Sequence, residues 1–416
     1  MPYSNTGKVA VQKPENLALK VYEHFHDIGL QRPSKALLEE FFDCLFYASL
    51  EREEGQEIRV TVTYYNPRSQ PARQDKEDGW SFVQLDKPIP LNVSSLVKLA
   101  KAADPWSGSV AVSHINQTLS IVGLIDQAVH LQSYLNLEEE ARPEQPGLFQ
   151  AFVTGIGSIT VMRNLHVIAS FKKGTLITDY LDVLSRKGQV FELITRIAEN
   201  TAVKVARKMK ENGLEAVPQP ELVVSCRVLY IRSLKRILTR IKNYAHGGAM
   251  LITPGQTDLK RKYGITYDRI TQTIIKIIYN KQLPPEEQTD MQALTRELKG
   301  AIRFVASQSC VDGLVLLDTS FVVKGFGVVI DTKDGPEKVY QSLNINFNPE
   351  KTAIIVPNHF GTRHRSMFSY CYYHPGSLGF VVSQDGDIRA ITRVGTKIVI
   401  WENILIQKGK ATPRKK

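Results

Sequence analysis

Apolar and polar residues follow two different spacings along the chain, which predict a mixture of helices and strands. Residues 34–48 place apolar side chains three and four positions apart, as an amphipathic helix does. Residues 58–64 instead alternate at every second position, which is typical of a half-buried strand. Pro218 and Pro220 indicate a linker within a helical region. The same patterns predict further helices at residues 16–25, 94–103, 189–212, 224–245, 268–279 and 289–307.

The order of the predicted elements repeats in the two halves of the chain. In each half, a helix–strand–helix series leads to a glycine that opens a short apolar strand, Gly108 in the first half and Gly313 in the second. A second apolar strand with its own glycine follows, and a third begins at Phe152 or Phe380. We therefore predict an α/β fold that contains two copies of one mixed-sheet unit.

Four segments follow from this repeat. The first copy is expected at residues 1–178, a helical connector at 179–225, the second copy at 226–407 and a basic tail at 408–416. Gly213 is expected to end the first connector helix, because glycine is common directly after a helix. A chain of 416 residues is long enough for this arrangement.

Residues 359–366, His-Phe-Gly-Thr-Arg-His-Arg-Ser, concentrate side chains that donate hydrogen bonds. Thr362 is expected to cap a following helix, because its hydroxyl can accept a hydrogen bond from a free backbone amide. A helix N-terminus beside the guanidinium groups of Arg363 and Arg365 suits a polyanion such as a triphosphate. An Arg-His-Arg run is also common in solvated loops, so a functional interpretation needs a second motif.

Asp312 and Gly313 supply that second motif at the start of an apolar strand. The glycine lets a ligand approach the backbone closely, and the carboxylate can bind a metal ion or accept a proton from a hydroxyl group. The two stretches together resemble the paired signature of diadenylate cyclases. The signature reads Asp312-Gly313-Leu314 and, at residues 361–365, Gly-Thr-Arg-His-Arg. The resemblance covers about residues 234–406.

Diadenylate cyclases join two ATP molecules into cyclic di-AMP and release pyrophosphate, so the resemblance implies this nucleotidyltransferase activity. It implies that Asp312 is catalytic, as a ligand of Mg²⁺ or Mn²⁺ or as the group that activates a 3′-hydroxyl, and that Asp385 also binds metal. Each subunit would bind one ATP and face a second subunit, so catalysis would need a homo-oligomer. The implied nucleotide contacts come from Gly313, Leu314, Gly361, Thr362, Arg363, His364, Arg365 and Ser383.

The chain departs from the family pattern at two positions. Leu314 stands where the family has a small alanine, so its side chain is expected to crowd the ribose or the base. Gln384 stands where family members often carry a glutamate. These differences leave open another base, another linkage or weak activity.

The first copy lacks the residues of both motifs. Ser107 precedes Gly108, where the second copy has Asp312, and no Gly-Thr-Arg-His-Arg sequence follows. The corresponding gap instead holds three glutamates at residues 138–140, which repel phosphate. We therefore predict that this copy is a degenerate, sensor-type domain that controls the second copy, either by binding an unknown ligand or by fixing how the subunits assemble.

Charge keeps two alternatives open. The formal net charge of +11 suits polyanions in general. A nucleic-acid-binding protein and a nucleotide sensor that has lost catalysis are therefore alternatives to the cyclase. No apolar run is long enough to span a bilayer, and residues 1–5 do not begin a signal peptide. A cytoplasmic protein without membrane contact is therefore expected. The four cysteines show no metal-ligand spacing.

Overall fold

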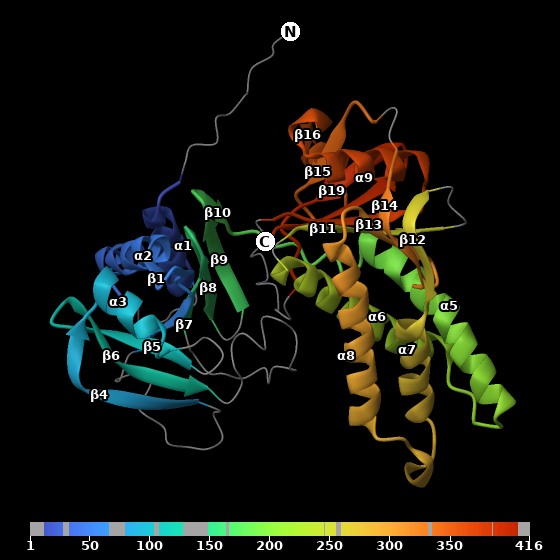
Figure 1. Cartoon of the computed structure of the whole chain (residues 1–416), viewed down its shortest axis with the longest axis horizontal. Coiled ribbons are helices and arrows are strands. Elements are labelled where there is room, and N and C mark those ends of the chain that lie inside the picture. The colour runs from blue at the N-terminus through green and yellow to red at the C-terminus, as the bar shows by residue number, and fades with distance from the viewer. Residues whose placement is uncertain are drawn as a thin grey trace. The chain divides into compact units, whose positions relative to one another are not determined.

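The computed structural model divides into an N-terminal unit that ends at Asp179 and a C-terminal unit from Tyr180 to Ile406 (Figure 1). Both units contain a mixed sheet with helices packed on it, which confirms the predicted α/β class. The structure describes residues 12–27, 33–65, 80–103, 108–127, 149–163, 166–244, 246–254, 259–331, 335–384 and 386–406.

In the described part of the N-terminal unit, eight strands form one sheet in the order β10-β9-β8-β7-β3-β5-β6-β4. The central strand β3 (Val60–Tyr64) is parallel to β5 (Gly108–Ile115) and antiparallel to β7 (Phe149–Gly155). The other pairs are antiparallel. The remaining strands are β4 (Trp80–Pro90), β6 (Thr118–Gln127), β8 (Ser158–Arg163), β9 (His166–Lys172) and β10 (Thr175–Ile177), with a separate hairpin of β1 (Arg52–Glu53) and β2 (Gln56–Glu57).

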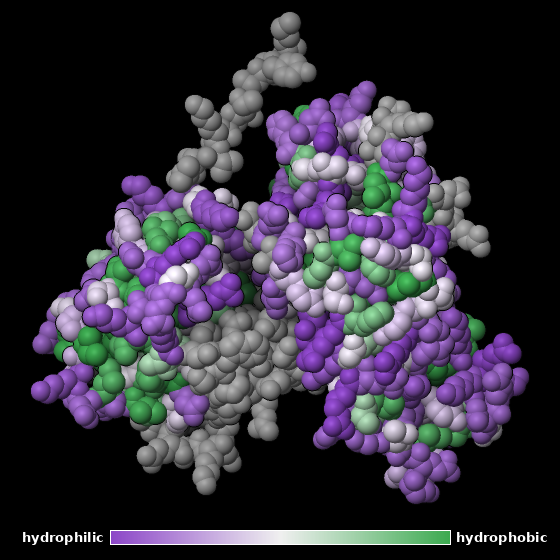
Figure 2. Space-filling model, viewed as in Figure 1, coloured by the Kyte–Doolittle hydropathy of each residue, from purple (hydrophilic) through white to green (hydrophobic). Residues whose placement is uncertain are grey.

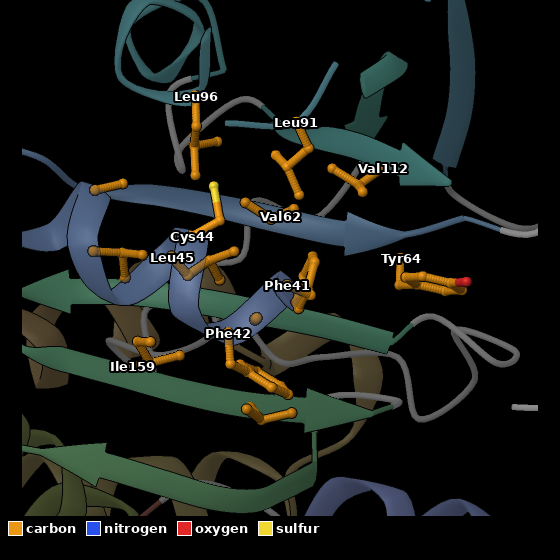
Figure 3. Close-up of a cluster of buried hydrophobic side chains, with 14 of the residues drawn as sticks. Phe41, Phe42, Cys44, Leu45, Val62, Tyr64, Leu91, Leu96, Val112 and Ile159 are labelled. Atoms are coloured by element: carbon orange, nitrogen blue, oxygen red, sulfur yellow. The ribbon is translucent and has the colours of Figure 1, made fainter. Parts of the chain in front are cut away.

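The core of the N-terminal unit lies between one sheet face and three helices. The helix predicted from apolar spacing begins after Ser34, whose hydroxyl accepts a hydrogen bond from the backbone amide of Leu37 at 3.2 Å. Figure 3 shows how Phe41 and Phe42 of this helix pack over the strands, with Val62 in the same cluster. The three helices are α1 (Pro14–Asp27), α2 (Lys35–Leu50) and α3 (Val93–Ala100).

In the described part of the C-terminal unit, nine strands form a sheet in the order β12-β14-β13-β11-β17-β18-β19-β15-β16. The central strand β11 (Gly248–Thr253) is parallel to β13 (Leu314–Asp318) and antiparallel to β17 (Leu378–Val382). The other strands are β12 (Lys260–Tyr267), β14 (Val323–Val329), β15 (Val339–Ser342), β16 (Thr352–Ile355), β18 (Ile388–Val394) and β19 (Lys397–Trp401).

Helices cover both faces of this second sheet. Figure 1 shows α9 on one side of the strands and α6, α7 and α8 on the other. The helices are α5 (Gln189–Glu211), α6 (Gln219–Asn243), α7 (Arg269–Asn280), α8 (Met291–Ser307) and α9 (Thr362–Tyr373), and the short 3₁₀ turns are η1 (Pro285–Glu287), η2 (Gln308–Cys310), η3 (Pro349–Lys351) and η4 (Pro357–His359).

Seven strands follow the same order in the two sheets. The series β9-β8-β7-β3-β5-β6-β4 in the N-terminal unit corresponds to β19-β18-β17-β11-β13-β14-β12 in the C-terminal unit. The one parallel pair among these seven strands, β3 with β5 and β11 with β13, has the same place in both. The segments that we matched in the sequence therefore lie on strands that correspond in position.

Gly108 and Gly313 are required by the same local packing in the two units. A Cβ on Gly108 would lie 2.4 Å from the carbonyl oxygen of Ile125, and one on Gly313 would lie 2.6 Å from the backbone of Gly327. One of our matches is displaced, because the strand pairings place Ala151, and not Phe152, in the position of Phe380. A shift of one residue turns a strand side chain to the other face.

The predicted connector does not form a separate segment, because α5 and α6 belong to the C-terminal unit. Gly213 follows α5 with a φ of +69°, as predicted. Pro220 does not lie in a linker but in the first turn of α6, which begins at Gln219. Proline is tolerated there because the first amides of a helix have no partner within the helix.

α9 lies unusually close to the sheet at Gly379 of β17. A Cβ at this position would lie 2.3 Å from both Cγ and Sδ of Met367, a fully buried residue of α9. The absence of a side chain at Gly379 therefore sets the distance between α9 and the strands beneath it.

We expect Gly379→Ala to destabilise the protein by about 1–3 kcal/mol, because the added methyl group overpacks the space occupied by Met367. The control is Gly300→Ala in α8, where a Cβ meets no atom within 4 Å. That substitution should stabilise the helix by about 0.5–1 kcal/mol. Denaturant unfolding of both variants measures the difference, and equal stabilities would contradict the close packing.

Candidate functional site

The Asp-Gly motif lies in the turn between η2 and β13. Gly313 has a φ of +115°, which L-residues rarely adopt, and its position against Gly327 leaves no room for a side chain. The turn leaves the side chain of Asp312 fully exposed. The carboxylate is therefore accessible to a ligand.

The second motif forms the first turn of α9. Gly361 is the N-cap residue, and no side chain caps this end of the helix. The expected capping role of Thr362 is therefore wrong, because Thr362 is already the first helical residue. Its carbonyl oxygen accepts a hydrogen bond from Ser366 Oγ at 2.8 Å. Arg363 and Arg365 are exposed at this end of the helix, where the helix dipole also favours anions.

The fold brings the two motifs together. Arg363 Nη2 lies 3.8 Å from Asp312 Oδ1, and Arg363 Nη1 donates a hydrogen bond to the carbonyl oxygen of His246 at 3.4 Å. Gly247 has a φ of +65°, and a Cβ there would lie 3.2 Å from Arg363 Nη1. The turn before β11 therefore supports Arg363 beside Asp312, a contribution that the sequence did not predict.

His364 is separated from the two exposed arginines. Its side chain is buried, with ring centroids 5.3 Å from Phe360 and 6.4 Å from Phe368. Arg389 Nη1 lies 3.3 Å from His364 Nε2, and since a guanidinium cannot accept a hydrogen bond, Nε2 is the acceptor. Burial first, and then the charges of Arg389 and Arg363, lower the pKa of His364 to about 4. His364 is thus neutral at physiological pH and adds no positive charge for phosphate.

The side chain of Leu314, which was expected to crowd the ribose or the base, lies in the core. Leu314 is the first residue of β13 and is 94 % buried, since only 6 % of it is exposed. It packs in the same apolar cluster as Met367 and Phe368 of α9. A larger residue than alanine therefore fills the core beneath α9 instead of crowding a ribose or a base.

The third predicted stretch forms the turn between β17 and β18. Ser383 Oγ accepts a hydrogen bond from the backbone amide of Asp387 at 3.1 Å, and Gly386 adopts a φ of +79°. The backbone amide of Gln384 would lie 3.2 Å from a Cβ on Gly247, so this turn borders the support of Arg363. Asp385, the expected second metal ligand, lies outside the described residues.

The described residues contain no group of three His, Cys, Asp or Glu side chains that could hold a metal ion alone. Mg²⁺ does not require such a group, because it is commonly bound by one or two carboxylates together with the phosphates of a substrate. Asp312 provides an exposed oxygen ligand of the kind that Mg²⁺ and Mn²⁺ prefer. The residues therefore fit a metal that arrives with a nucleotide.

A surface pocket of about 450 Å³ lies at the opposite ends of the two central parallel strands. It is lined by Pro254 after β11, Thr319 after β13, Gly376 before β17 and Arg196 of α5, among others. None of the lining residues belongs to the two motifs. The pocket is thus separate from the candidate site, where the side chains of Asp312, Arg363 and Arg365 are exposed.

A comparison with known families concerns the N-terminal unit. Residues 30–126 match a family model described as "Probable sensor domain DACNV". The match runs from α2 to β6 and does not reach the motifs of the C-terminal unit. No curated protein matches the chain.

Two further expectations concern membranes and cysteines. Among the helices that the structure describes, none combines the length and apolar character needed to cross a membrane. Figure 2 shows that hydrophilic residues cover most of the visible surface and that apolar residues form small separate groups. All four cysteines are free thiols, and only Cys310 is exposed.

The lowered pKa of His364 predicts how stability depends on pH. In the unfolded chain the pKa is near 6.5 and in the folded protein about 4, so the unfolded state binds the proton first. Between pH 7.5 and 4.5 this residue should lower the free energy of unfolding by about 2–3 kcal/mol. The contribution is fully present above pH 6.5 and disappears as the pH falls toward 4.

His364→Gln should remove this part of the pH dependence, because glutamine cannot take the proton. Unfolding can be followed by the fluorescence of the buried Trp401 after Trp80 and Trp106 are replaced by phenylalanine. The wild type should lose about 2–3 kcal/mol more than the variant over this range. Parallel pH profiles would show that His364 is not held neutral.

Proposed function

We propose that the C-terminal unit condenses two ATP molecules into cyclic di-AMP, or a related cyclic dinucleotide, with release of pyrophosphate. The observation that supports this most is the approach of Arg363 to Asp312 at 3.8 Å. It joins two motifs that are far apart in the sequence and that resemble the paired signature of diadenylate cyclases. An anion-binding group beside a carboxylate that can bind a metal ion or accept a proton suits phosphoryl transfer.

In this proposal, Arg363, Arg365 and the N-terminus of α9 bind the ATP phosphates. Planar guanidinium groups form paired hydrogen bonds with phosphate oxygens and offset the charge that develops on the leaving pyrophosphate. Asp312 lies beside Arg363, so it can accept the proton of a 3′-hydroxyl or bind the metal. Mg²⁺ or Mn²⁺ held by Asp312 would neutralise phosphate charge.

The chemistry requires two nucleotides, and the candidate site has one set of phosphate-binding groups per chain. We therefore propose that two chains face each other, so that the 3′-oxygen of each nucleotide attacks the α-phosphate of the other. Each attack forms a phosphodiester bond and breaks the bond to pyrophosphate. ATP is the small-molecule partner, a homo-oligomer is the active form, and the cytoplasm is the expected location because it supplies ATP.

The N-terminal unit is proposed to regulate this reaction as a degenerate copy of the cyclase unit. Two observations support the proposal: the match of residues 30–126 to a sensor-domain family, and the seven strands that share one order with the C-terminal sheet. Ser107, which stands in place of Asp312, and residues 138–140 lie outside the described part of the chain. The signal that this unit would receive is a ligand of unknown chemistry.

Incubation of the full chain with ATP and Mg²⁺ or Mn²⁺, followed by mass spectrometry of the products, tests the activity. Asp312→Asn keeps the shape of the side chain and removes its charge, so turnover should fall by at least ~10²-fold. Glu287→Gln in the exposed turn η1 is the matched control and should leave turnover unchanged. Wild-type turnover in Asp312→Asn would refute the catalytic role of Asp312.

Binding measurements with ATP and with nucleic acid, made beside the product assay, separate the alternatives. Binding of ATP without any cyclic dinucleotide would identify a nucleotide sensor that lacks catalysis. Binding of nucleic acid without affinity for ATP would favour a nucleic-acid-binding protein. The arginines of α9 would then contact the phosphate backbone of the nucleic acid.

A fragment of residues 180–406 tests regulation. It keeps α5, whose apolar face, including Val190, Ile194 and Ile197, is buried in the C-terminal unit. A fragment that starts near Pro220 would instead lose that packing. We expect the longer fragment to bind ATP while its turnover or its oligomeric state differs from that of the full chain, as measured by product assay and light scattering. Equal rates and equal subunit numbers would contradict a regulatory N-terminal unit.

A further inference from the structure

We propose that Arg389 and Glu402 are positioning residues that hold His364 and the first turn of α9, and that the segment directly after the N-terminal unit controls this pair. The contacts stand independently of the proposed activity. Their consequence for nucleotide binding rests on the proposed function of the motif.

A chain of three contacts connects β15 with the end of β19 and with the motif. Glu402 Oε1 accepts a hydrogen bond from Arg389 Nε at 2.6 Å, and Gln341 Nε2 donates to the other carboxylate oxygen at 2.5 Å. Arg389 Nη1 then donates to His364 Nε2 at 3.3 Å. The side chains of Arg389 and Glu402 are about four-fifths buried, at 20 % and 23 % exposure. The guanidinium is thus fixed on both sides.

The hydrogen bond from Arg389 fixes the tautomer of His364. Because Arg389 donates to Nε2, the ring proton of the neutral imidazole is on Nδ1. The charged groups around the ring are Arg389 from β18 and Arg363 from its own helix, with Glu402 behind Arg389. A partner that fixes tautomer and orientation in this way is a common means of positioning a histidine.

The segment after the N-terminal unit lies next to this pair. Leu181 forms a parallel bridge with Ile404: its amide donates to the carbonyl of Asn403 at 3.0 Å, and its carbonyl accepts from Leu405 at 2.9 Å. The amide of Ile404 in turn donates to the carbonyl of Ile388 at 3.3 Å. Leu181 is therefore bonded to Asn403, which follows Glu402. Ile404, its partner in the bridge, is bonded to Ile388, which precedes Arg389.

A nearly buried ion pair anchors the same segment. Asp182 Oδ1 lies 3.4 Å from Lys235 Nζ of α6, with side-chain exposures of 10 % and 9 %. Asp182 also accepts a hydrogen bond from the backbone amide of Ser185. Leu181 and Asp182 are the second and third residues after Asp179, where the N-terminal unit ends, so the bridge and the ion pair lie at the start of the C-terminal unit.

The test uses the full chain with ¹⁵N-labelled histidine imidazoles and follows the titration of His364 by NMR, with its signal assigned by its loss in His364→Gln. Arg389→Met should raise the pKa of His364, because one of the two nearby positive charges is removed. ATP affinity should fall on the order of tenfold, because the first turn of α9, which presents Arg363 and Arg365, loses a positioning contact. Arg389→Lys should not restore either property, since it cannot contact Glu402 and His364 with one planar fork.

Arg393→Met is the matched control on the same strand. Arg393 Nη1 also bonds to α9, but at the opposite end of the helix, where it donates to the carbonyl of Tyr372 at 2.7 Å. Its loss should leave the His364 titration unchanged. Leu181→Pro removes the amide that donates to Asn403 and should shift the His364 signal, with Asp182→Asn as the second variant if the first does not fold.

An unchanged His364 titration in Arg389→Met would overturn the positioning role. An unchanged signal in both Leu181→Pro and Asp182→Asn would overturn control by the segment after the N-terminal unit. These readouts do not need turnover, so a chain that binds no ATP and forms no product would refute the proposed function and leave the positioning contacts to be judged by NMR alone.

Discussion

The parallel pairing of β11 with β13 is the constraint on which the candidate site depends. Parallel strands begin at the same edge of a sheet, so the turn at Gly247 and the turn at Asp312 lie side by side. The antiparallel strand β17 ends at that edge and delivers Ser383 there. Leu314, at the start of β13, packs in one apolar cluster with residues of α9 and so connects this edge with the helix. A shift of one residue in this pairing would turn Leu314 to the opposite face of the sheet and remove the support of α9.

The two sheets share a strand order but differ on the face that carries α9 in the C-terminal unit. Residues Ala249, Leu251 and Leu314 make that face apolar. By strand pairing, the corresponding residues of the N-terminal sheet are Thr61, Thr63 and Ser109. Thr63 Oγ1 lies 2.7 Å from Ser109 Oγ and accepts a hydrogen bond from Gln150 at 3.1 Å. Thr61 Oγ1 is buried on the same face without a hydrogen-bond partner among the described residues. Such a polar face offers little apolar surface to a helix like α9. The units therefore differ in packing as well as in motif residues.

Local patterns in the sequence predicted the helices and the glycine turns, because these depend on residues close in the chain. The use of the two motifs in one site was expected only from the resemblance of short motifs to a known family. Thr362 and Pro220 were misplaced because the exact start of a helix depends on backbone angles that neighbouring residue types do not determine. The burial of His364 could not be predicted from an Arg-His-Arg run, since only packing decides which of three adjacent helical side chains faces the sheet. Arg389 and Glu402 carry no signal at all, because their contacts join distant strands.

The electrostatics of the motif follow from this packing. Arg363 has as its ion-pair partner the fully exposed carboxylate of Asp312 at 3.8 Å, and an exposed pair at that distance is strongly screened by water. Arg389, by contrast, is satisfied by Glu402 in a protected position. The buried arginine therefore supports the structure, and the exposed arginine keeps its charge available for an anion. The neutral state of His364 fits the same arrangement. A protonated His364 would add a positive charge in the first turn of α9, near Arg363 and Arg389, and positive charge is unfavourable at the N-terminus of a helix.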